Sequence, residues 1–382
     1  MNGPSTGRFV ALDAWRGIAA VLVALYRIEV GGELHSLSFV QNAWLFVDFF
    51  FVLSGFVIAG AYGDRLGSPR ATLAFVLRRF GRLWPLHAAM LAAFVAVECV
   101  KYAMGFSKGD TGTAFTDGRA PMTIAWDFLL IQALGVTDYT SWNSPAWSIS
   151  TEFWTYLVFA LLCFGGRRTV VVAAPLLVAA GLAIVAMHSP TAMDTTFEYG
   201  MARCLAGFFA GVLAFATWRS FGTVFVPGVA AATVLECLVI TVAVVFVAAS
   251  GRTTWTLFAP LVFSMLVLVF AYEKGRVSRL LTTKVGLLLG ELSYSIYMTA
   301  LLVSLVFNKA PVFIARMIGI DIGEPHEGAL YPHSNIDLGQ SLLNDAYSVV
   351  YLVAVVAVSW VTFRLIEQPT RAWFNRLAGR IA

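Results

Sequence analysis

The sequence contains few charged residues. Only 13% of its 382 residues are Asp, Glu, Lys or Arg, whereas 59% are hydrophobic and 14% are aromatic. A soluble domain usually carries about twice that charged fraction, so the composition excludes a soluble globular protein. It indicates instead an all-α polytopic membrane protein, a bundle of helices that crosses the lipid bilayer. No break in composition divides the chain, and we expect residues 1–382 to form a single transmembrane domain.

Cysteines are also scarce. The four of them lie inside apolar stretches and show neither a CxxC motif nor Cys/His spacing. That pattern argues against a zinc site and against a disulfide framework, and we expect no bound metal. The net charge is only +4, and Lys and Arg occur in short runs between apolar stretches. A nucleic-acid partner is therefore not expected, because it requires a continuous basic stripe.

Long apolar stretches, by contrast, are abundant. A helix that crosses a bilayer needs about 20 such residues, and ten stretches qualify: 10–28, 41–61, 84–104, 146–165, 169–187, 199–217, 225–249, 254–271, 286–308 and 344–366. The first contains Asp13 and Arg16 and lacks a cleavage site, so we interpret it as a retained span rather than a signal peptide. A weaker stretch at 123–135 is too short to cross and is predicted to be interfacial or re-entrant.

Positive charge alternates along the loops. Lys and Arg gather in 62–83, 166–168, 218–224, 272–285 and the C-terminal tail, whereas 29–40 and 188–198 have none. By the positive-inside rule, this alternation predicts about ten transmembrane helices with both termini in the cytoplasm. The short turn 250–253, with Arg252, is the one loop that does not support the assignment.

Burying a charged side chain inside a predicted span costs free energy, so we expect each such residue to have a structural or functional role. Arg16 and Arg27 are eleven positions apart in the first span, about three helical turns, and project from one face. Asp48 and Glu152 lie in the outer halves of their spans, at a depth comparable to that of Arg27. These groups either form a structural ion pair, Arg27 with Asp48 or Glu152, or line a functional cavity, and we favour the cavity.

A cationic cluster precedes the third span. The segment LRRFGRLWPLH contains Arg78, Arg79 and Arg82, and His87 lies one turn inside the span. Arg79 and Arg82 are three residues apart and face one way on a helix. Two guanidinium groups at a helix start suit phosphate oxygens, although such a cluster is also an ordinary topology signal.

Six motifs occur in order along the chain: LDAWRGIAAVLVALYR, WLFVDFFFVLSGFVI, RRFGRLWPLH, WSISTEFW, GELSYSIYM and RLIEQPTRAWF. From about residue 9 to 376, the chain thereby resembles the acyltransferase-3 family of membrane acyltransferases. The resemblance implies transfer of an acyl group from a cytoplasmic acyl-CoA, with acetyl-CoA as the expected donor. The implied acceptor is a hydroxyl of an exported glycan, a lipid-linked sugar or a small molecule, and the implied location is a bacterial inner membrane.

The resemblance also assigns roles to individual residues. It implies a donor site formed by Arg16, Arg79 and Arg82, to which we add His87. It implies that Asp48 and Glu152 belong to the catalytic site.

The chain departs from the family at two histidines, which are replaced by Arg27 and Ala300. The family treats the first of them as catalytic. Arginine has no acceptor atom and stays protonated, so Arg27 can stabilise an oxyanion or a carboxylate but cannot serve as a general base.

Three explanations of this departure stay open. The base is Glu152, His35 or His87; the protein is a catalytically impaired family member; or it is a transporter or flippase that passes its ligand without acyl transfer. His35 follows Arg27 by eight residues in an outer loop, where it either folds over the site or is an ordinary solvated residue.

Overall fold

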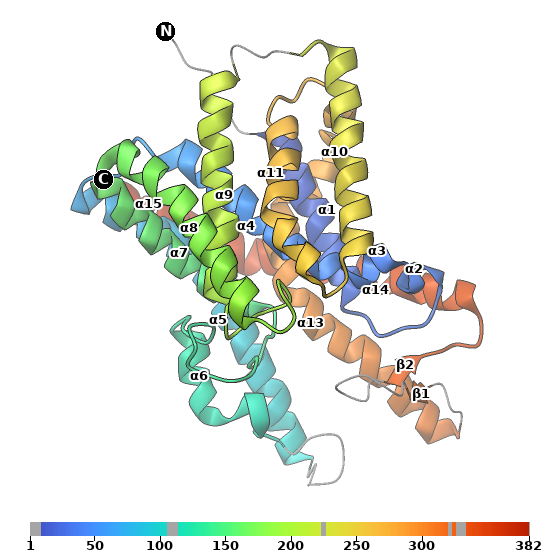
Figure 1. Ribbon diagram of the computed structural model, residues 1–382. Coiled ribbons are helices and arrows are strands. Elements are labelled where there is room, and N and C mark those ends of the chain that lie inside the picture. The colour runs from blue at the N-terminus through green and yellow to red at the C-terminus, as the bar shows by residue number, and fades with distance from the viewer. Residues whose placement is uncertain (1–8, 105–113, 223–226, 320–322, 326–333, 382) are drawn as a thin grey trace.

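The structure is a computed structural model that describes residues 9–104, 114–222, 227–319, 323–325 and 334–381. Helices make up most of this part of the chain (Figure 1), which confirms the all-α fold class. The sequence did not indicate the two short antiparallel strands, β1 (Gly323–Pro325) and β2 (Ser334–Ile336).

Every predicted span coincides with a helix in the described residues. In chain order these helices are α1 (Val10–Tyr26), α4 (Phe46–Tyr62), α5 (Pro69–Ala103), α7 (Ala146–Phe164), α8 (Gly166–His188), α9 (Gly200–Phe221), α10 (Val229–Ser250), α11 (Ala259–Phe270), α13 (Lys284–Ile318) and α14 (Ser341–Thr362). Eight of the apolar helical segments are long enough to cross a membrane, and α1 and the segment containing α11 are shorter. The protein is thus a multi-pass membrane protein.

Short elements connect these helices. They are α2 (Glu33–Ser36), α3 (Ser38–Gln41), η1 (Ala43–Leu45), η2 (Asp117–Arg119), α6 (Pro121–Phe128), η3 (Thr254–Phe258), α12 (Arg276–Leu281), the π-helical turn η4 (Phe363–Glu367) and α15 (Gln368–Gly379). The helix α6 has only eight residues and cannot cross a bilayer, as predicted for stretch 123–135.

The third span begins earlier than predicted. Helix α5 starts at Pro69 rather than at residue 84, because Ser68 caps it by accepting a hydrogen bond from the Ala71 backbone N–H and Pro69 occupies the first turn. Hydropathy detects only the apolar part of this helix. Arg79 and Arg82 therefore lie within a helix, well past its first turn.

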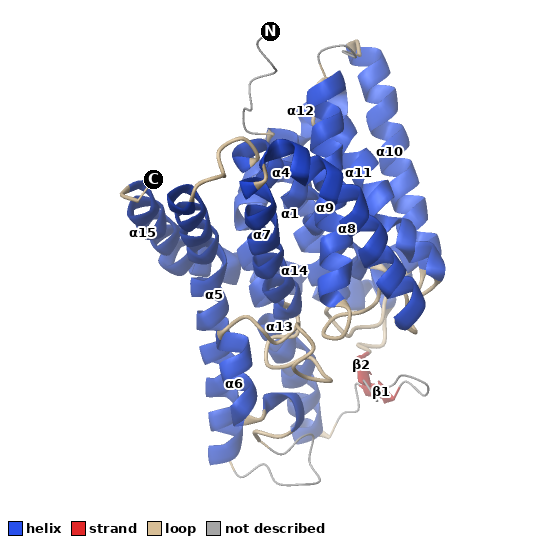
Figure 2. Ribbon diagram, turned by 60° about the vertical axis from the view of Figure 1, so that its left-hand side comes forward, coloured by secondary structure: helices blue, strands red, loops and turns tan. Residues whose placement is uncertain are grey.

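The two ends of the bundle differ. The chain termini are marked in the upper half of Figures 1 and 2, whereas α6, β1 and β2 lie at the bottom. We call these ends the terminal face and the opposite face. Because both termini lie at the same end of the bundle, the arrangement agrees with an even number of membrane crossings.

Glycines allow the closest helix contacts. A Cβ added to Gly55 of α4 would lie 1.8 Å from the Phe208 carbonyl oxygen, and one added to Gly211 of α9 would lie 1.9 Å from the Val52 carbonyl oxygen. A Cβ on Gly207 would come within 2.8 Å of Phe51, so the sequence motif at Gly207 and Gly211 is a close contact with α4.

Helix α5 packs elsewhere. Its backbone lies close to α7, α13 and α15, whereas it meets α4, its neighbour along the chain, through side chains such as the rings of Tyr62 and Phe75, whose centres are 4.9 Å apart. The space that this leaves between α4 and α5 holds the cavity described next.

Candidate functional site

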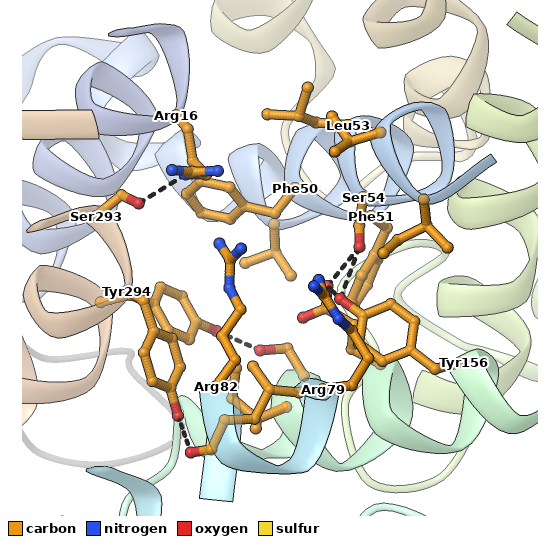
Figure 3. A pocket seen from close by; sticks show the side chains of 18 residues that line it. Arg16, Phe50, Phe51, Leu53, Ser54, Arg79, Arg82, Tyr156, Ser293 and Tyr294 are labelled. Carbon is orange, nitrogen blue, oxygen red and sulfur yellow. Dashed lines mark hydrogen bonds between the residues drawn. The ribbon is translucent and has the colours of Figure 1, made fainter. Parts of the chain in front are cut away.

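A cavity lies between α4 and α5, with walls completed by α1, α7 and α13 (Figure 3). It encloses about 760 Å³ of space between atoms, with its open mouth included. Along α4 its lining runs from Val47 to Ile58, about 16 Å at the helical rise. Its polar lining consists of Arg16, Ser54, Arg79, Arg82, Ser148, Glu152, Tyr156, Ser293, Tyr294 and Tyr297.

Arg16 is fixed on the α1 side of the cavity. Its Nε donates to Ser293 Oγ at 2.8 Å, and a terminal nitrogen donates to the Gly290 carbonyl at 2.9 Å. The same terminal nitrogen lies 3.2 Å from the Asp13 carboxylate. These contacts leave the guanidinium edge turned into the cavity (Figure 3).

Arg79 and Arg82 reach the cavity from α5. Arg79 lies over the rings of Tyr62, Phe75 and Tyr156, at 5.5 to 6.0 Å from their centres. Its buried Nε has no hydrogen-bond partner in the described part of the chain. The guanidinium groups of Arg16, Arg79 and Arg82 converge on the cavity interior (Figure 3). The predicted donor-site arginines are thus brought together, although they lie on two helices.

Glu152 is the acid that lines this described cavity. Its Oε1 accepts hydrogen bonds from Ser54 Oγ at 2.7 Å and from Tyr156 Oη at 2.5 Å. Ser54 belongs to α4 and Tyr156 follows Glu152 by one helical turn on α7. Glu152 therefore lies in the same cavity as the three arginines.

The end of the cavity toward the opposite face is neutral. There the hydroxyls of Ser148 and Tyr297 lie 2.8 Å apart, and Tyr297 donates to the Pro145 carbonyl at 3.0 Å. The charge of Arg27 acts on Tyr297, but Arg27 itself does not line the cavity. Arg27 therefore lies behind the cavity wall at this end.

The expected convergence of Asp48 with Arg27 and Glu152 is wrong. Asp48 is fully buried and pairs with Arg203 of α9, whose Nε and terminal nitrogen donate to the two carboxylate oxygens at 3.0 and 2.7 Å. The rings of Trp44 and Trp147 lie 5.3 and 5.2 Å from the Arg203 guanidinium. The pair joins α4 to α9 outside the cavity. The buried carboxylate is neutralised by the nearest cation, and that cation is not Arg27.

Neither predicted histidine lines the cavity. His87 is buried, and its Nε2 lies 2.8 Å from the Asp127 carbonyl oxygen. His35 is half-buried on α2, where partial burial lowers its pKa. Asp127, on α6, accepts a hydrogen bond from Ser141, and burial raises its pKa to about 7. His87, Asp127 and Ser141 therefore form one polar cluster, and His35 lies separately on α2. None of them lines the cavity with the three arginines.

Sequence reasoning missed three charged or hydroxyl groups, of which Tyr156 lines the cavity and Arg203 and Glu367 lie outside its lining. Arg203 and Glu367 lie within apolar helical segments, so the cost of burying a charge was an available signal for both. Glu367 is buried at the π turn η4, accepts a hydrogen bond from Ser295 at 2.8 Å, and lies in the field of Arg16 and Arg82. The link between Tyr156 and Glu152 follows from their spacing of four residues.

Comparisons with known proteins find one matching family and two related proteins. The sequence matches the acyltransferase-3 family model, described as an acyltransferase domain, over residues 9–364. It is 32% identical over 172 residues to protein 2 in picA locus of Rhizobium radiobacter, covering 42% of this chain and 85% of that protein. It is 30% identical over 169 residues to acyltransferase MdmB of Streptomyces mycarofaciens, covering 41% of this chain and 40% of that protein. No solved structure matches the chain.

Proposed function

The chain belongs to the acyltransferase-3 family and is a membrane acyltransferase, and on that premise we propose that it transfers an acyl group from acyl-CoA to a hydroxyl. Acetyl-CoA is the proposed donor, and a glycan, a lipid-linked sugar or a small hydroxylated molecule is the proposed acceptor. The observation that carries the proposal is the cavity in which three arginines from α1 and α5 face one carboxylate from α7.

The arginines support an anionic donor. Arg82 has no hydrogen bond or ion pair to another described residue, and the buried Nε atom of half-buried Arg79 is unpaired in the described part of the chain. The three guanidinium groups carry more positive charge than the single carboxylate of the cavity offsets, so an anion bound between them lowers their mutual repulsion. Phosphate groups of coenzyme A supply that charge and accept bidentate hydrogen bonds. The residues present therefore fit the donor.

Glu152 supports base catalysis. The acceptor O–H attacks the thioester carbonyl, and Glu152 takes its proton as the new C–O bond forms. The C–S bond then breaks, the coenzyme A thiolate leaves, and the proton passes from Glu152 to the thiolate. The products are an acyl ester and free coenzyme A, and Glu152 is again a carboxylate.

We propose that the two substrates arrive from different faces. Arg79 lies in the first third of α5, which begins toward the terminal face, where the Lys/Arg-rich connections gather. We assign this face to the cytoplasm of a bacterial inner membrane. The neutral end contains Ser148 in the first turn of α7, which follows the α6 segment, and so lies toward the opposite face. The acceptor hydroxyl then meets the thioester near Glu152, between the two ends.

The test measures coenzyme A release by the purified protein in detergent, with acetyl-CoA as donor and glucose as a probe hydroxyl. We expect glucose to stimulate release and to become acetylated. Glu152→Gln should lower the rate about 10²–10⁴-fold, the usual contribution of a general base. Asp64→Asn, which breaks an exposed ion pair with Arg219, is the control and should retain activity.

A different outcome would favour transport. If neither glucose nor a membrane glycan extract is acetylated, but the protein carries acetyl-CoA or a glycan across liposome membranes, the acyltransferase proposal is wrong.

A further inference from the structure

A second groove lies at the terminal face, where α4 and α9 end and α8 begins. It is bordered by α4, α7, α8 and α9 and encloses about 370 Å³ of space between atoms, with its open mouth included. We call it the α8 groove. It shares no lining residue with the cavity of the three arginines, so acyl transfer in that cavity does not account for it.

The floor of the α8 groove is apolar. Phe159 of α7, Val170 of α8 and Phe215 of α9 line it, and each is at most 6% exposed. Val171 and Ala216 border the same space and are less buried. An open apolar surface of this kind favours contact with hydrocarbon over contact with water. The floor therefore suits an acyl chain.

The rim of the α8 groove is charged. It carries Arg167, Arg219 and Asp64. Arg219 pairs with Asp64, whereas Arg167 has no hydrogen bond or ion pair to another residue that the structure describes. The three residues lie in three of the Lys/Arg-rich segments, 62–83, 166–168 and 218–224. The rim thus holds one unbalanced positive charge beside an apolar floor.

Lipid has direct access to the α8 groove. Helix α8 lies at the periphery of the bundle, because only 22% of the residues in its apolar segment are buried inside the protein. Exposed apolar side chains continue along α8 beyond the groove, at Val172 and Leu176. In a membrane protein, such a surface contacts acyl chains. The groove therefore connects the headgroup region, at its arginine rim, with the hydrocarbon of the bilayer.

We infer that the α8 groove binds one anionic phospholipid, with the lipid phosphate at Arg167 and Arg219 and one acyl chain along the apolar floor. Charge complementarity favours this occupant. The unbalanced positive charge of the rim matches the single negative charge of phosphatidylglycerol, and guanidinium groups suit phosphate oxygens. Basic pockets between transmembrane helices bind anionic headgroups in this way. A free phosphate would leave the floor uncovered, and phosphatidylcholine has no net charge to balance the rim.

The first measurement tests recognition of the headgroup. The purified full-length protein in detergent, in about 0.15 M ammonium acetate, is titrated with phosphatidylglycerol, and bound lipid is counted by native mass spectrometry. We expect one saturable lipid in the parent and an affinity weaker by about tenfold or more in Arg167→Gln, because a charge-assisted contact is lost.

Arg168→Gln is the matched control. It removes the same charge from the next residue of α8, which is exposed and does not line the groove. Its affinity for phosphatidylglycerol should stay within about twofold of the parent's, because water and salt screen an exposed charge.

The second measurement locates the acyl chain. A phosphatidylglycerol with a photoreactive diazirine on its chain should form crosslinks to Val171 and Ala216, identified by peptide mass spectrometry. Ala216→Phe fills the groove and should remove these crosslinks, whereas Thr217→Phe, at an exposed position outside the groove, should retain them. Because Arg167 is exposed, Arg167→Gln keeps the test decisive if Ala216→Phe does not fold.

Three outcomes would overturn the inference. Equal losses in Arg167→Gln and Arg168→Gln would show a general attraction of lipid to surface charge. Equally tight binding of phosphatidylcholine would show an apolar groove without headgroup recognition. Displacement of the lipid by an equal concentration of inorganic phosphate would show a free-phosphate site. None of these measurements depends on acyl transfer, so the proposed function and this inference fail or hold separately.

Discussion

Arg27 is the residue at which the chain departs most visibly from the acyltransferase-3 pattern, because an arginine there cannot accept a proton. In the structure it lies at the C-cap of α1, outside the cavity lining, with its charge acting on Tyr297 and Tyr351. The second replaced histidine, Ala300, is buried, and its carbonyl accepts a hydrogen bond from Tyr351 at 3.2 Å. Both departures therefore lie near Tyr351 and outside the cavity lining, and Glu152 remains the carboxylate that lines the cavity.

Arg27→His tests whether a base is missing. If Glu152 is the base, histidine at this position should change the acetyl-transfer rate by less than about tenfold, because it does not line the cavity. A missing base would instead give a gain of about 10²–10⁴-fold near neutral pH, where a histidine titrates. Steady-state transfer rates of the parent and the variant decide between these outcomes, and a gain of that size would overturn the role of Glu152.

The arginine cluster on α5 offers a matched comparison. Arg79 and Arg82 line the cavity, whereas neighbouring Arg78 does not. Replacing both Arg79 and Arg82 with Gln should weaken acetyl-CoA binding by several kcal/mol, since a hydrogen bond to a charged group contributes about 1.5–3 kcal/mol. Calorimetry on the double variant measures this loss. Arg78→Gln removes the same charge from the same helix and should bind acetyl-CoA like the parent; equal losses in the two would contradict a specific donor site.

At the level of elements, the position of α4 depends on how closely it approaches α9. Gly55 and Gly211 bring the two backbones into contact, and the Asp48–Arg203 pair fastens the helices near the opposite face. Helix α4 carries Ser54, so the α4–α9 contact also fixes one donor to Glu152. Packing at this interface is thereby linked to the geometry of the candidate site.

Gly55→Ala should destabilise this interface. The added Cβ would lie 1.8 Å from a backbone carbonyl, so one of the two helices must move. Overpacking of this kind costs about 1–3 kcal/mol, and we expect a lower melting temperature and lower activity in detergent. Gly379→Ala, at a helical glycine with no atom within 4 Å of the added Cβ, is the control and should be neutral or slightly stabilising. A Gly55→Ala protein that melts like the parent would show that α4 and α9 are not tightly packed.

The sequence predicted helices better than it predicted their partners. The ten apolar stretches all became helices because burying backbone hydrogen bonds in lipid leaves few alternatives, and this constraint is local. The sequence also predicted that Arg79 and Arg82 share one face of a helix, because residues three apart lie on the same face. The pairing of Asp48 with Arg203 joins residues 155 positions apart, and only tertiary packing selects it. For the same reason, the depth at which α5 carries its arginines could not be read from hydropathy.

At the level of the whole molecule, the orientation in the membrane is the premise on which the separate entry of donor and acceptor depends. Arg168 lies in the first turn of α8, just after the short connection between α7 and α8, which is one of the Lys/Arg-rich connections of the terminal face. The exposed Asp138 lies in the segment after α6, at the opposite face. The background for labelling is favourable, because Cys163 and Cys204 are buried and only Cys99 and Cys237 are exposed.

With Cys99 and Cys237 replaced by Ser, single cysteines at Arg168→Cys and Asp138→Cys report the two faces. In intact bacterial cells expressing the protein, a membrane-impermeant maleimide should label Asp138→Cys at once and Arg168→Cys only after the inner membrane is opened. The reason is electrostatic, since short loops rich in Lys and Arg stay on the cytoplasmic side. Labelling of both positions in intact cells would break the crossing order, and labelling of Arg168→Cys alone would invert the bundle. In the inverted case the three arginines would open away from the cytoplasmic pool of acyl-CoA, and the proposed donor route would be wrong even if the cavity binds coenzyme A.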